Sequence, residues 1–424
     1  MERFIGIRHR VKKTTAGQAR PTQIFILGGG KKGQDLVLDL PDEQSELDFA
    51  HGVLVAAMRD VKMGEDVSIF PPHQLGWRKV KDDEDVSALP KGFFKKEGKD
   101  RYVLGKVPAA FEGLREGDVV GMILGGSGDR LAAALSRSGE NVGASVYRVP
   151  SFVFKNWRGQ DEDKDKDAEL LAQKVRNERG SFYKVESRDR AFIRVSEALS
   201  FRQEALAARI ACEQRLHASF IGSIFLSERG LYPEGMIEKE YQRRSANDMV
   251  LQNLEEELKR RESELKKAVE ATALWDRVFA PISGVGPRLA AAFIASIVDI
   301  RRFETDAKLK AYCGAHVLPD GRFPRRRGGE VANWSPDLRQ ALYLLGDQFN
   351  RRPDSVWGQK LISYKAKFRD RHAKEIGTNG KSRYSDGHIH RMATWRTLTK
   401  FVEWLWKEWW KLEKDRQREE RQAA

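Results

Sequence analysis

The sequence is poor in cysteine and has no long hydrophobic run. Its 424 residues include two cysteines, Cys212 and Cys313. Two thiols are too few for a disulfide framework or, by themselves, for a four-ligand zinc site. One third of the residues are charged, and no apolar stretch approaches the roughly 20 residues that a membrane-spanning helix needs. We therefore expect no membrane contact, and the low cysteine content favours a reducing compartment.

A secretory signal is also missing from the first residues. The opening stretch MERFIGIRHR has neither the apolar core nor the small-residue cleavage site of such a signal. We therefore expect a cytoplasmic protein. The length predicts two to four domains with at least one substantial core.

Positive charge is concentrated in one part of the chain. Lys and Arg number 76 against 62 Asp and Glu, which gives a formal net charge of +14. Residues 301–407 hold 23 Lys and Arg against 11 Asp and Glu, so most of the excess lies in about a quarter of the chain. A basic total alone is compatible with nucleic acid, an anionic membrane surface or simple solubility. Its concentration in one region calls for a regional explanation.

The first segment, residues 1–185, alternates short apolar runs with glycine turns. Residues 118–149 read as a strand, a glycine turn, a helix and a second strand, which predicts an α/β domain. Residues 76–116 are rich in Lys, Asp, Gly and Pro, and we interpret them as an insertion into this domain.

The second segment, residues 186–277, has apolar residues at spacings of three and four. The pattern runs from Phe192 to Ile224 and resumes from Ile237 to Val269 after a turn that contains Gly and Pro. We predict two long helices in an antiparallel coiled-coil hairpin. A dimerisation or spacer role is the main interpretation, and direct nucleic-acid contact by exposed Arg and Lys is the alternative.

A glycine-containing turn opens the third segment, residues 278–350. The sequence SGVGPR from Ser283 precedes an alanine-rich helix and has the form of a helix-hairpin-helix turn. Gly284 and Gly286 would let the backbone approach a phosphate, and Arg288 would add a charge at the helix N-terminus. Such a turn holds a nucleic-acid backbone without reading bases. A packing turn between two helices would have the same sequence pattern.

Residues 321–329, GRFPRRRGG, combine arginine, an aromatic ring and glycine. Arginine binds phosphate bidentately, and Phe323 could stack on an unpaired base. A solvated charge run is the alternative, but proline and glycine favour a shaped loop. The arginines of this loop are Arg322, Arg325, Arg326 and Arg327.

Other motifs are weaker. Residues 161–169 hold six carboxylates that could bind a metal, but they alternate with lysine as solvated loops do. The glycine-rich stretches 28–33 and 125–128 complete neither a Walker A nor a GxGxxG pattern. His388 and His390 have no adjacent Cys or carboxylate set, so we interpret them as surface histidines.

The order of an α/β domain, a long helical hairpin and a Gly-x-Gly helical module resembles the DEDD-type transposases of insertion sequences, which use a bridge RNA to choose DNA. The resemblance implies an RNase H-like first domain. The same C-terminal stretch is similar to the Nop domain of box C/D ribonucleoproteins, which follows a coiled coil and binds a structured RNA. The most specific motifs are ISGVGPRLAAA from Ile282, DIRRF from Asp299, LKAYCG from Leu309 and LRQALYLL from Leu338.

Catalysis in that transposase family needs a metal-binding carboxylate tetrad and a serine nucleophile. By resemblance, the first-strand Asp position falls near Gly28, the central Glu position at Gly125, and the closing pair at Lys164 and Asp167. The serine position falls at Asp320. Glycine cannot hold a metal, and Asp cannot form a phosphoserine linkage. The resemblance therefore implies that the recombinase chemistry is lost while the RNA-binding frame remains.

This combination is similar to the Tas proteins of TIGR systems, which are prokaryotic and phage RNA-guided DNA-targeting proteins built on a Nop domain. No convincing nuclease signature follows residue 350, which favours the stand-alone type without a nuclease. The resemblance implies a structured guide RNA, a DNA target chosen by base pairing with it, and a homodimer through the coiled coil. No cofactor is expected.

Two alternatives remain open. One is a bridge-RNA transposase with divergent catalytic residues, the case in which Mg²⁺ would be required. The other is a Nop-type ribonucleoprotein scaffold with no DNA target.

The sequence thus predicts an α+β multidomain protein with four parts. These are a degenerate RNase H-like domain (1–185), a coiled-coil hairpin (186–277), an α-helical Nop-like or helix-hairpin-helix-like domain (278–350) and a basic, Trp-rich helical extension (351–424). No catalytic residue or metal ligand is predicted. The predicted RNA- and DNA-contacting residues are Gly284, Gly286, Arg288, Lys308, Lys310, Arg322, Phe323, Arg325, Arg326, Arg327, Arg339, Arg351 and Arg352.

Overall fold

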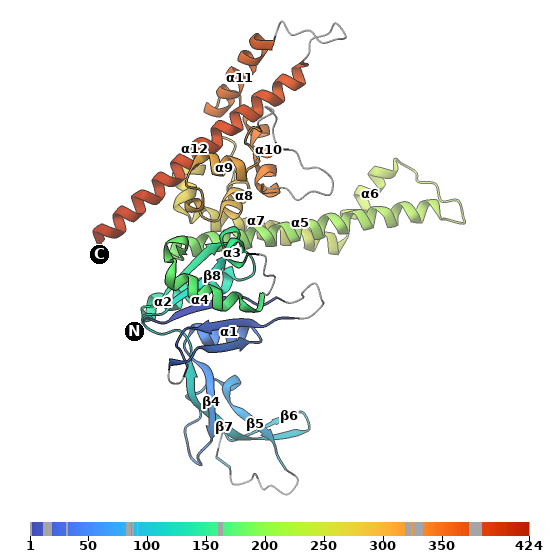
Figure 1. Cartoon of the computed structure of the whole chain (residues 1–424). Coiled ribbons are helices and arrows are strands. Elements are labelled where there is room, and N and C mark those ends of the chain that lie inside the picture. Colours follow the sequence, from blue (N-terminus) through green and yellow to red (C-terminus); the bar gives the residue numbers. More distant parts are fainter. Residues whose placement is uncertain are drawn as a thin grey trace. The chain divides into compact units, whose positions relative to one another are not determined.

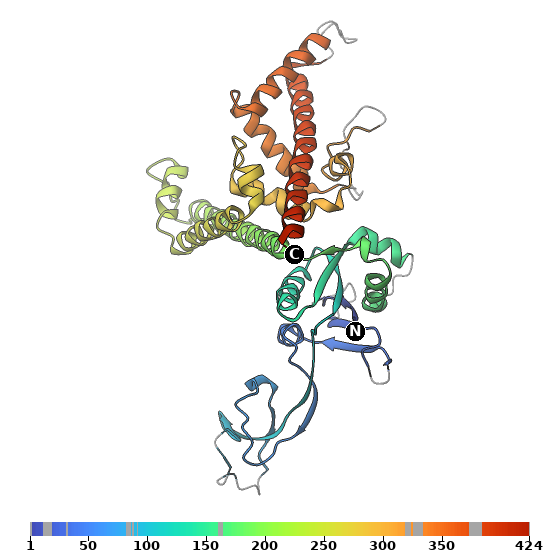
Figure 2. The same ribbon diagram turned by 90° about the vertical axis from the view of Figure 1, so that its left-hand side faces the viewer.

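The chain divides into two compact units, residues 1–187 and 188–424 (Figures 1 and 2). The first contains mixed sheets with covering helices, and the second is helical throughout its described part, so the predicted α+β multidomain class is confirmed. The computed structural model describes residues 2–11, 19–30, 33–81, 86, 89–90, 92–159, 164–318, 324, 334–372 and 384–423.

The first unit is built on a six-stranded sheet in the order β10-β9-β8-β1-β2-β3. Its strands β1, β2 and β3 form an antiparallel meander, whereas β8 and β9 run parallel to β1. The carboxyl ends of β1, β8 and β9 therefore share one edge of the sheet. The strands are β1 (Phe4–Arg8), β2 (Thr22–Ile26), β3 (Leu36–Leu40), β8 (Val119–Leu124), β9 (Ser145–Pro150) and β10 (Tyr183–Lys184).

Helices cover both faces of this sheet. An apolar core with Ile5, Ile7 and Leu135 packs under α1 (Glu43–Ala50) and α2 (Asp129–Val142). A second core with Val149 and Leu171 packs under α3 (Ser151–Arg158) and α4 (Asp167–Asn177). The alternation of side chains along each strand produces these two faces.

Two glycines let α4 lie very close to the sheet. Gly6 of β1 and Gly121 of β8 are neighbours in register. A Cβ at Gly6 would stand 1.9 Å from the carbonyl oxygen of Ala168, and a Cβ at Gly121 would meet Val175 at 3.0 Å. The missing side chains therefore fix the position of α4, and with it the position of Asp167 at its first residue.

A smaller antiparallel sheet lies between α1 and β8 in the chain. It comprises β4 (Leu54–Asp60), β5 (Gly76–Lys79), β6 (Phe94–Glu97) and β7 (Asp100–Glu112), with β7 pairing to the other three. The predicted insertion begins at residue 76, but the sheet already begins with β4. The sequence of β4, LVAAMRD, does not indicate a strand because it lacks a clear alternation of apolar and polar residues.

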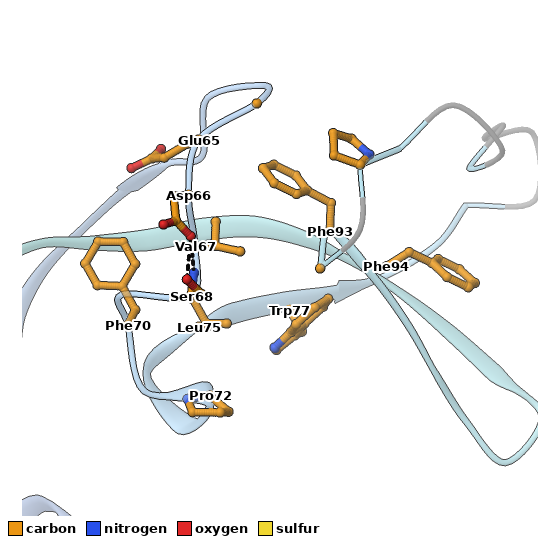
Figure 3. A pocket seen from close by; sticks show the side chains of 13 residues that line it. Glu65, Asp66, Val67, Ser68, Phe70, Pro72, Leu75, Trp77, Phe93 and Phe94 are labelled. Carbon is orange, nitrogen blue, oxygen red and sulfur yellow. Dashed lines mark hydrogen bonds between the residues drawn. The ribbon is translucent and has the colours of Figure 1, made fainter.

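The small sheet carries a cavity of about 670 Å³ (Figure 3). Phe70, Trp77 and Phe93 are among its lining residues. The ammonium of Lys95 lies 4.8 Å from the centre of the Trp77 ring, so a cation covers one side of this aromatic group.

The second unit opens with a long helical hairpin. Helices α5 (Ser187–Phe225) and α7 (Met249–Glu270) lie side by side in both views, and the short α6 (Ile237–Ser245) connects them (Figures 1 and 2). Arg202 of α5 bonds to Glu262 of α7 at 2.8 Å, and the Arg261 guanidinium lies 4.9 Å from the Phe201 ring. The predicted hairpin is present, and its coiled-coil geometry stays a prediction.

The second arm of this hairpin is interrupted, whereas the sequence pattern predicted one continuous helix. The Asp248 side chain accepts a hydrogen bond from Leu251 N and so begins a new helix, α7.

The remaining helices form the largest apolar core. After a π-helical turn (Trp275–Phe279) come α8 (Pro287–Ile297), the 3-10 turn η6 (Ile300–Arg302), α9 (Asp306–Tyr312) and α10 (Pro336–Arg351). The chain then continues as α11 (Val356–His372) and α12 (Asp386–Ala423), which pair with each other. Aromatic side chains of α12, including Phe401 and Trp409, lie in this core. No described helix is long and apolar enough to cross a membrane.

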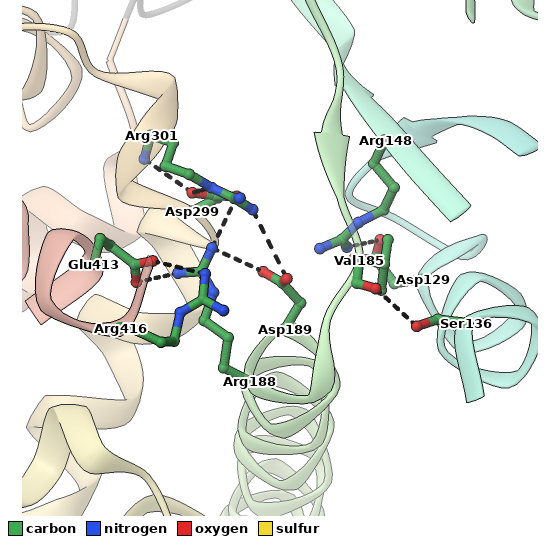
Figure 4. Close-up of polar contacts among 10 residues, drawn as sticks. All are labelled: Asp129, Ser136, Arg148, Val185, Arg188, Asp189, Asp299, Arg301, Glu413 and Arg416. Atoms are coloured by element: carbon green, nitrogen blue, oxygen red, sulfur yellow. Dashed lines mark hydrogen bonds and ion pairs between the residues drawn. The ribbon is translucent and has the colours of Figure 1, made fainter. Parts of the chain in front are cut away.

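A buried ionic network joins the start of α5, η6 and the far end of α12 (Figure 4). Asp299 is fully buried and accepts from Arg301 Nη2 at 2.7 Å. Arg188 lies 3.6 Å from Asp299 and also pairs with Glu413. Three segments far apart in the sequence are thereby tied together at the base of the hairpin.

Within the first unit, Figure 4 shows a separate pair of polar contacts. Arg148 of β9 bonds to Asp129 of α2 at 2.7 Å, and the hydroxyl of Ser136 donates to the carbonyl oxygen of Val185 at 2.8 Å. Both contacts hold α2 against the strands next to it.

Candidate nucleic-acid interface

The Gly-x-Gly turn forms the exposed entry to α8. Val285 is buried and anchors the turn, and Gly284 has a φ of +94°, a conformation that favours glycine. Gly286 is the exposed N-cap residue of α8, and no side chain caps this helix end. The positive end of the helix dipole is therefore open to an anion.

Arg352 lies against the turn. A Cβ at Gly284 would come within 3.1 Å of both the Arg352 side chain and Gln348 Cβ, so the glycine leaves the room that this arginine fills. Arg288 on α8 and Arg351 at the end of α10 are exposed as well. The structure thus brings Gly284, Gly286 and Arg352 together, with Arg288 two residues further along.

These arginines carry uncompensated charge. Within the residues that the structure covers, Arg288, Arg351 and Arg352 form no ion pair. The Arg352 guanidinium donates instead to the neutral amide oxygen of Gln348. Exposed guanidinium groups next to an open helix N-terminus are suited to phosphate oxygens.

The two predicted lysines of α9 are paired with carboxylates. Lys308 is exposed and bonds to Glu304 at 2.6 Å. Lys310 is held between Asp306 at 3.0 Å and Glu403 at 3.1 Å. Burial alone would lower the pKa of Lys310, but the bonds to the two carboxylates outweigh it and raise that pKa. The Lys310 ammonium therefore ties α9 to α12.

Arg339 is also engaged inside the fold. Its guanidinium lies between the rings of Trp334 and Trp395, at 5.1 and 5.0 Å from their centres. Nη1 of Arg339 donates to the carbonyl oxygen of Pro324 at 2.6 Å. This side chain contacts Pro324 and Trp334, which precede α10, and Trp395 of α12.

The predicted arginine loop lies outside the described residues. This applies to Arg322, Phe323, Arg325, Arg326 and Arg327, and to Asp320 at the expected serine position. Their role in binding stays a prediction.

In the first unit, Asp167 lies at the edge of the sheet where the parallel strands end. Asp129 lies at the same edge, where it accepts a hydrogen bond from Gly125 N at 3.1 Å just after β8. Asp167 is 4 % exposed and accepts two bonds from Arg158, at 2.9 Å from Nε and 2.6 Å from Nη2. Burial is the largest influence on Asp167 and raises its pKa, although Arg158 and Arg8 act in the opposite direction. The carboxylate is thus enclosed by guanidinium groups.

Arg8 ends β1 at this same edge. It is 9 % exposed, and in the described part of the chain its Nε and Nη1 have no hydrogen-bond partner. It alternates with Gly6 along the strand and so shares the face on which α4 packs. No sequence pattern singles out Arg8 or Arg158, because their proximity to Asp167 depends on the sheet topology.

The expected first-strand position near Gly28 is wrong. Gly28 follows β2, which is antiparallel to β1, and Leu27 N bonds to the Phe4 carbonyl at the start of β1. Gly125 follows β8 at the opposite edge. Gly28 and Gly125 therefore cannot belong to one centre, and Arg8 is the residue that β1 brings to the Gly125 edge.

The remaining position of the expected tetrad is Lys164, which is exposed one turn before α4. Its charge also acts on Asp167. Among the residues with described placement, no three His, Cys, Asp or Glu side chains gather as a metal site would require.

Residues 276–353 match the model of the transposase family IS116/IS110/IS902. No curated protein matches the chain. The matched segment runs from the π-helical turn through α8, α9 and α10, and it contains the Gly-x-Gly turn together with Arg351 and Arg352. The match supports a relation between this part of the chain and the IS110-type transposases.

Proposed function

We propose that the chain binds a structured guide RNA through the surface around the Gly-x-Gly turn, and that base pairing of this RNA selects a DNA target. The observation that carries the proposal is a set of exposed arginines beside an uncapped helix N-terminus, which form no ion pair within the described part of the chain. They are Arg288, Arg351 and Arg352. This surface belongs to the segment that matches the transposase family IS116/IS110/IS902. Backbone contacts of this kind hold RNA without reading its sequence.

The chain holds nucleic acid and does not cut it. An antiparallel three-strand meander followed by two parallel strands supports an RNase H-like first domain. At the edge where such a domain would bind metal, Asp167 is paired with Arg158, and β1 ends in Arg8. The other expected positions, Gly125 and Lys164, carry no carboxylate. Metal-dependent phosphoryl transfer needs several converging carboxylates. Guanidinium groups around one carboxylate oppose the binding of a divalent cation.

A homodimer through the tip of the helical hairpin completes the proposal. Large apolar side chains are exposed there, a pattern that marks interaction surfaces. Their partner is the same tip of a second copy. They are Phe225 (74 % exposed), Leu226 (82 %), Leu231 (56 %), Tyr232 (92 %), Met236 (69 %), Met249 (73 %) and Val250 (61 %).

Two measurements test the function: sequencing of the RNA that copurifies with the protein, and an electrophoretic mobility-shift assay of the RNA-bound protein with DNA. The expected result is a defined RNA and a retarded complex with guide-matched DNA, but none with scrambled DNA. The triple variant Arg288→Ala/Arg351→Ala/Arg352→Ala should lose the RNA. A control with the same charge change on the hairpin, Lys239→Ala/Lys259→Ala/Lys267→Ala, should retain it.

Failure of the proposal has two forms. If no specific RNA copurifies, RNA guidance is excluded. If a defined RNA binds but matched DNA does not, the chain is a ribonucleoprotein scaffold.

The family match favours one rival, a bridge-RNA transposase with divergent catalytic residues. It predicts strand cleavage or a covalent protein–DNA adduct when Mg²⁺ is added, and loss of both in Asp167→Ala. Unchanged DNA after incubation with RNA, matched DNA and Mg²⁺ contradicts the rival and supports the proposal.

A further inference from the structure

A second basic surface lies outside the segment that matches the transposase family. It consists of α11 and the first part of α12, residues 356–372 and 384–400, and is called here the basic arm. The basic arm contains eight Lys and Arg against two Asp and Glu. Such a charge excess on a pair of helices is unfavourable unless an anion accompanies it.

Most cations of the basic arm have no acidic partner among the residues with described placement. In the described part of the arm, ion pairs join Arg369 to Asp386 at 3.3 Å and Lys400 to Glu403 at 2.7 Å. Lys365 donates to the neutral amide of Asn350. Three exposed cations form neither an ion pair nor such a hydrogen bond within the described residues. They are Lys367, Arg371 and Arg391. Their charges are free to meet phosphate groups.

The cations also crowd one another. Burial, and then the charge of Arg369, lowers the pKa of Lys365. The pKa of His390 is lowered by burial and by Lys365 and Arg391, against a smaller opposing effect of Asp347. Like charges held together in the folded protein would be relieved by a bound polyanion.

A series of aromatic rings runs along the same arm. Tyr364, Phe368 and His372 occupy successive i, i+4 positions on α11, and the series continues through Tyr384 to His388 of α12. Neighbouring ring centres are 6.4, 6.3, 4.7 and 4.9 Å apart. Tyr364 and Phe368 pack against the edge of the apolar core, but the three rings beyond them do not belong to it.

Exposed cations border the ring series on one side. Side chains at positions i and i+4 form a line along a helix. The residue at i+3 lies on one side of this line, and the residue at i+1 lies on the other. Lys367 and Arg371 therefore border Tyr364, Phe368 and His372 on one side. A row of rings bordered by unpaired cations is the arrangement that holds unpaired bases and their phosphates.

We propose that the basic arm binds an unpaired, single-stranded stretch of RNA, with bases against the ring series and phosphates on Lys367, Arg371 and Arg391. That the strand is RNA rests on the proposed function. The arm is a second nucleic-acid surface, in addition to the one around the Gly-x-Gly turn.

Fluorescence anisotropy with the full-length protein, stripped of nucleic acid by high-salt chromatography, tests this assignment. The probe is a short fluorescein-labelled oligouridylate, measured over a salt series. Lys367→Ala/Arg371→Ala/Arg391→Ala should weaken binding about tenfold or more and reduce the salt slope by about 2. The matched control Lys239→Ala/Lys259→Ala/Lys267→Ala should change neither. Equal behaviour of the two triple variants would overturn the assignment.

A ring variant tests the role of stacking. Phe368→Leu keeps apolar volume on α11 and removes the ring, so oligouridylate affinity should fall about fivefold or more while duplex DNA affinity stays unchanged. Duplex DNA that binds as tightly as oligouridylate, or oligothymidylate that binds more tightly, would contradict a site for unpaired RNA. If no guide RNA copurifies but oligouridylate binding still depends on the arm, the proposed function fails and the arm assignment stands.

Discussion

The second unit contains two helical hairpins of opposite electrostatic character. Residues 187–270, which form the α5–α7 hairpin, hold 15 Lys and Arg and 15 Asp and Glu. Its arginines bond repeatedly to neighbouring glutamates, as Arg260 and Arg261 do to Glu257 and Glu264. The basic arm holds four cations for every acidic residue, and most of them form no ion pair with the residues that the structure describes.

The contrast separates two uses of a long helix. A helix whose charges pair at i, i+3 and i, i+4 is solvated and neutral, and its apolar tip is left to make contacts. A helix whose cations lack partners stores repulsion that an anionic ligand can relieve. The number of arginines cannot make this distinction, because a neutral and a basic hairpin can both be rich in arginine.

The largest expected effect concerns the base of the two hairpins, where the buried network ties α5 to α12. Arg188 and Arg301 share two buried carboxylates, Asp299 and the more distant Asp189. Asp299→Ala removes the one that Arg301 bonds at 2.7 Å, and we expect a loss of about 3–5 kcal/mol of unfolding free energy. Urea denaturation followed by circular dichroism measures it. A loss as small as that of a surface ion pair would show that the network does not join the hairpins.

The same carboxylate predicts an acid sensitivity. Burial opposes ionisation of Asp299, but its bonds to Arg301 and the charge of Arg188 outweigh burial and lower its pKa. A lowered folded-state pKa gives stability that is present above the unfolded value, about 3.9, and lost as pH falls below it. Denaturation midpoints between pH 7 and pH 3 should therefore fall less in Asp299→Asn than in the natural chain.

The second effect concerns the tip of the neutral hairpin. Leu226→Asp/Tyr232→Asp places two charges on the exposed apolar surface, and we expect the dimer dissociation constant to rise about 100-fold or more. Analytical ultracentrifugation over a concentration series measures it. The same substitution pattern on the basic arm, Ser363→Asp/Gln359→Asp, should leave the dimer intact. A dimer that survives the tip variant would place the interface elsewhere.

Local sequence patterns predicted the α/β first domain, the helical hairpin and the Gly-x-Gly turn, because alternation, three-and-four spacing and glycine placement act over short distances. They did not predict that Lys310 and Arg339 are held inside the fold, since their partners Glu403 and Trp395 lie far along the chain. The proximity of Arg8 to Asp167 could not be predicted from the sequence, because it depends on the strand order, which places β1 beside β8.

A third test gives the neutral hairpin unpaired cations. Glu257→Gln/Glu264→Gln removes the acidic partners of Arg260 and Arg261. The affinity for oligouridylate should then rise by less than about threefold over that of the natural chain, and the rise should disappear at high salt. The gain is small because α7 lacks a ring series. The pKa of Glu257 is lowered by its bonds to the two arginines, so the natural pairs persist at neutral pH and break in acid. Affinity equal to that of the basic arm would show that unpaired charge alone suffices.

The smallest effect is a titration shift on the basic arm. His390 is surrounded by Lys365 of α11, Asp347 of α10 and its neighbour Arg391, and burial with the two cations keeps its pKa below the ordinary value. RNA phosphates on the arm would reduce that repulsion, so the His390 pKa should rise by a fraction of a unit toward 6.5 when oligouridylate binds. NMR titration of the imidazole, with His217 on the neutral hairpin as internal control, measures it. A rise of the same size at His217 would mean that RNA does not distinguish the two hairpins, and the electrostatic contrast between them would have no consequence for binding.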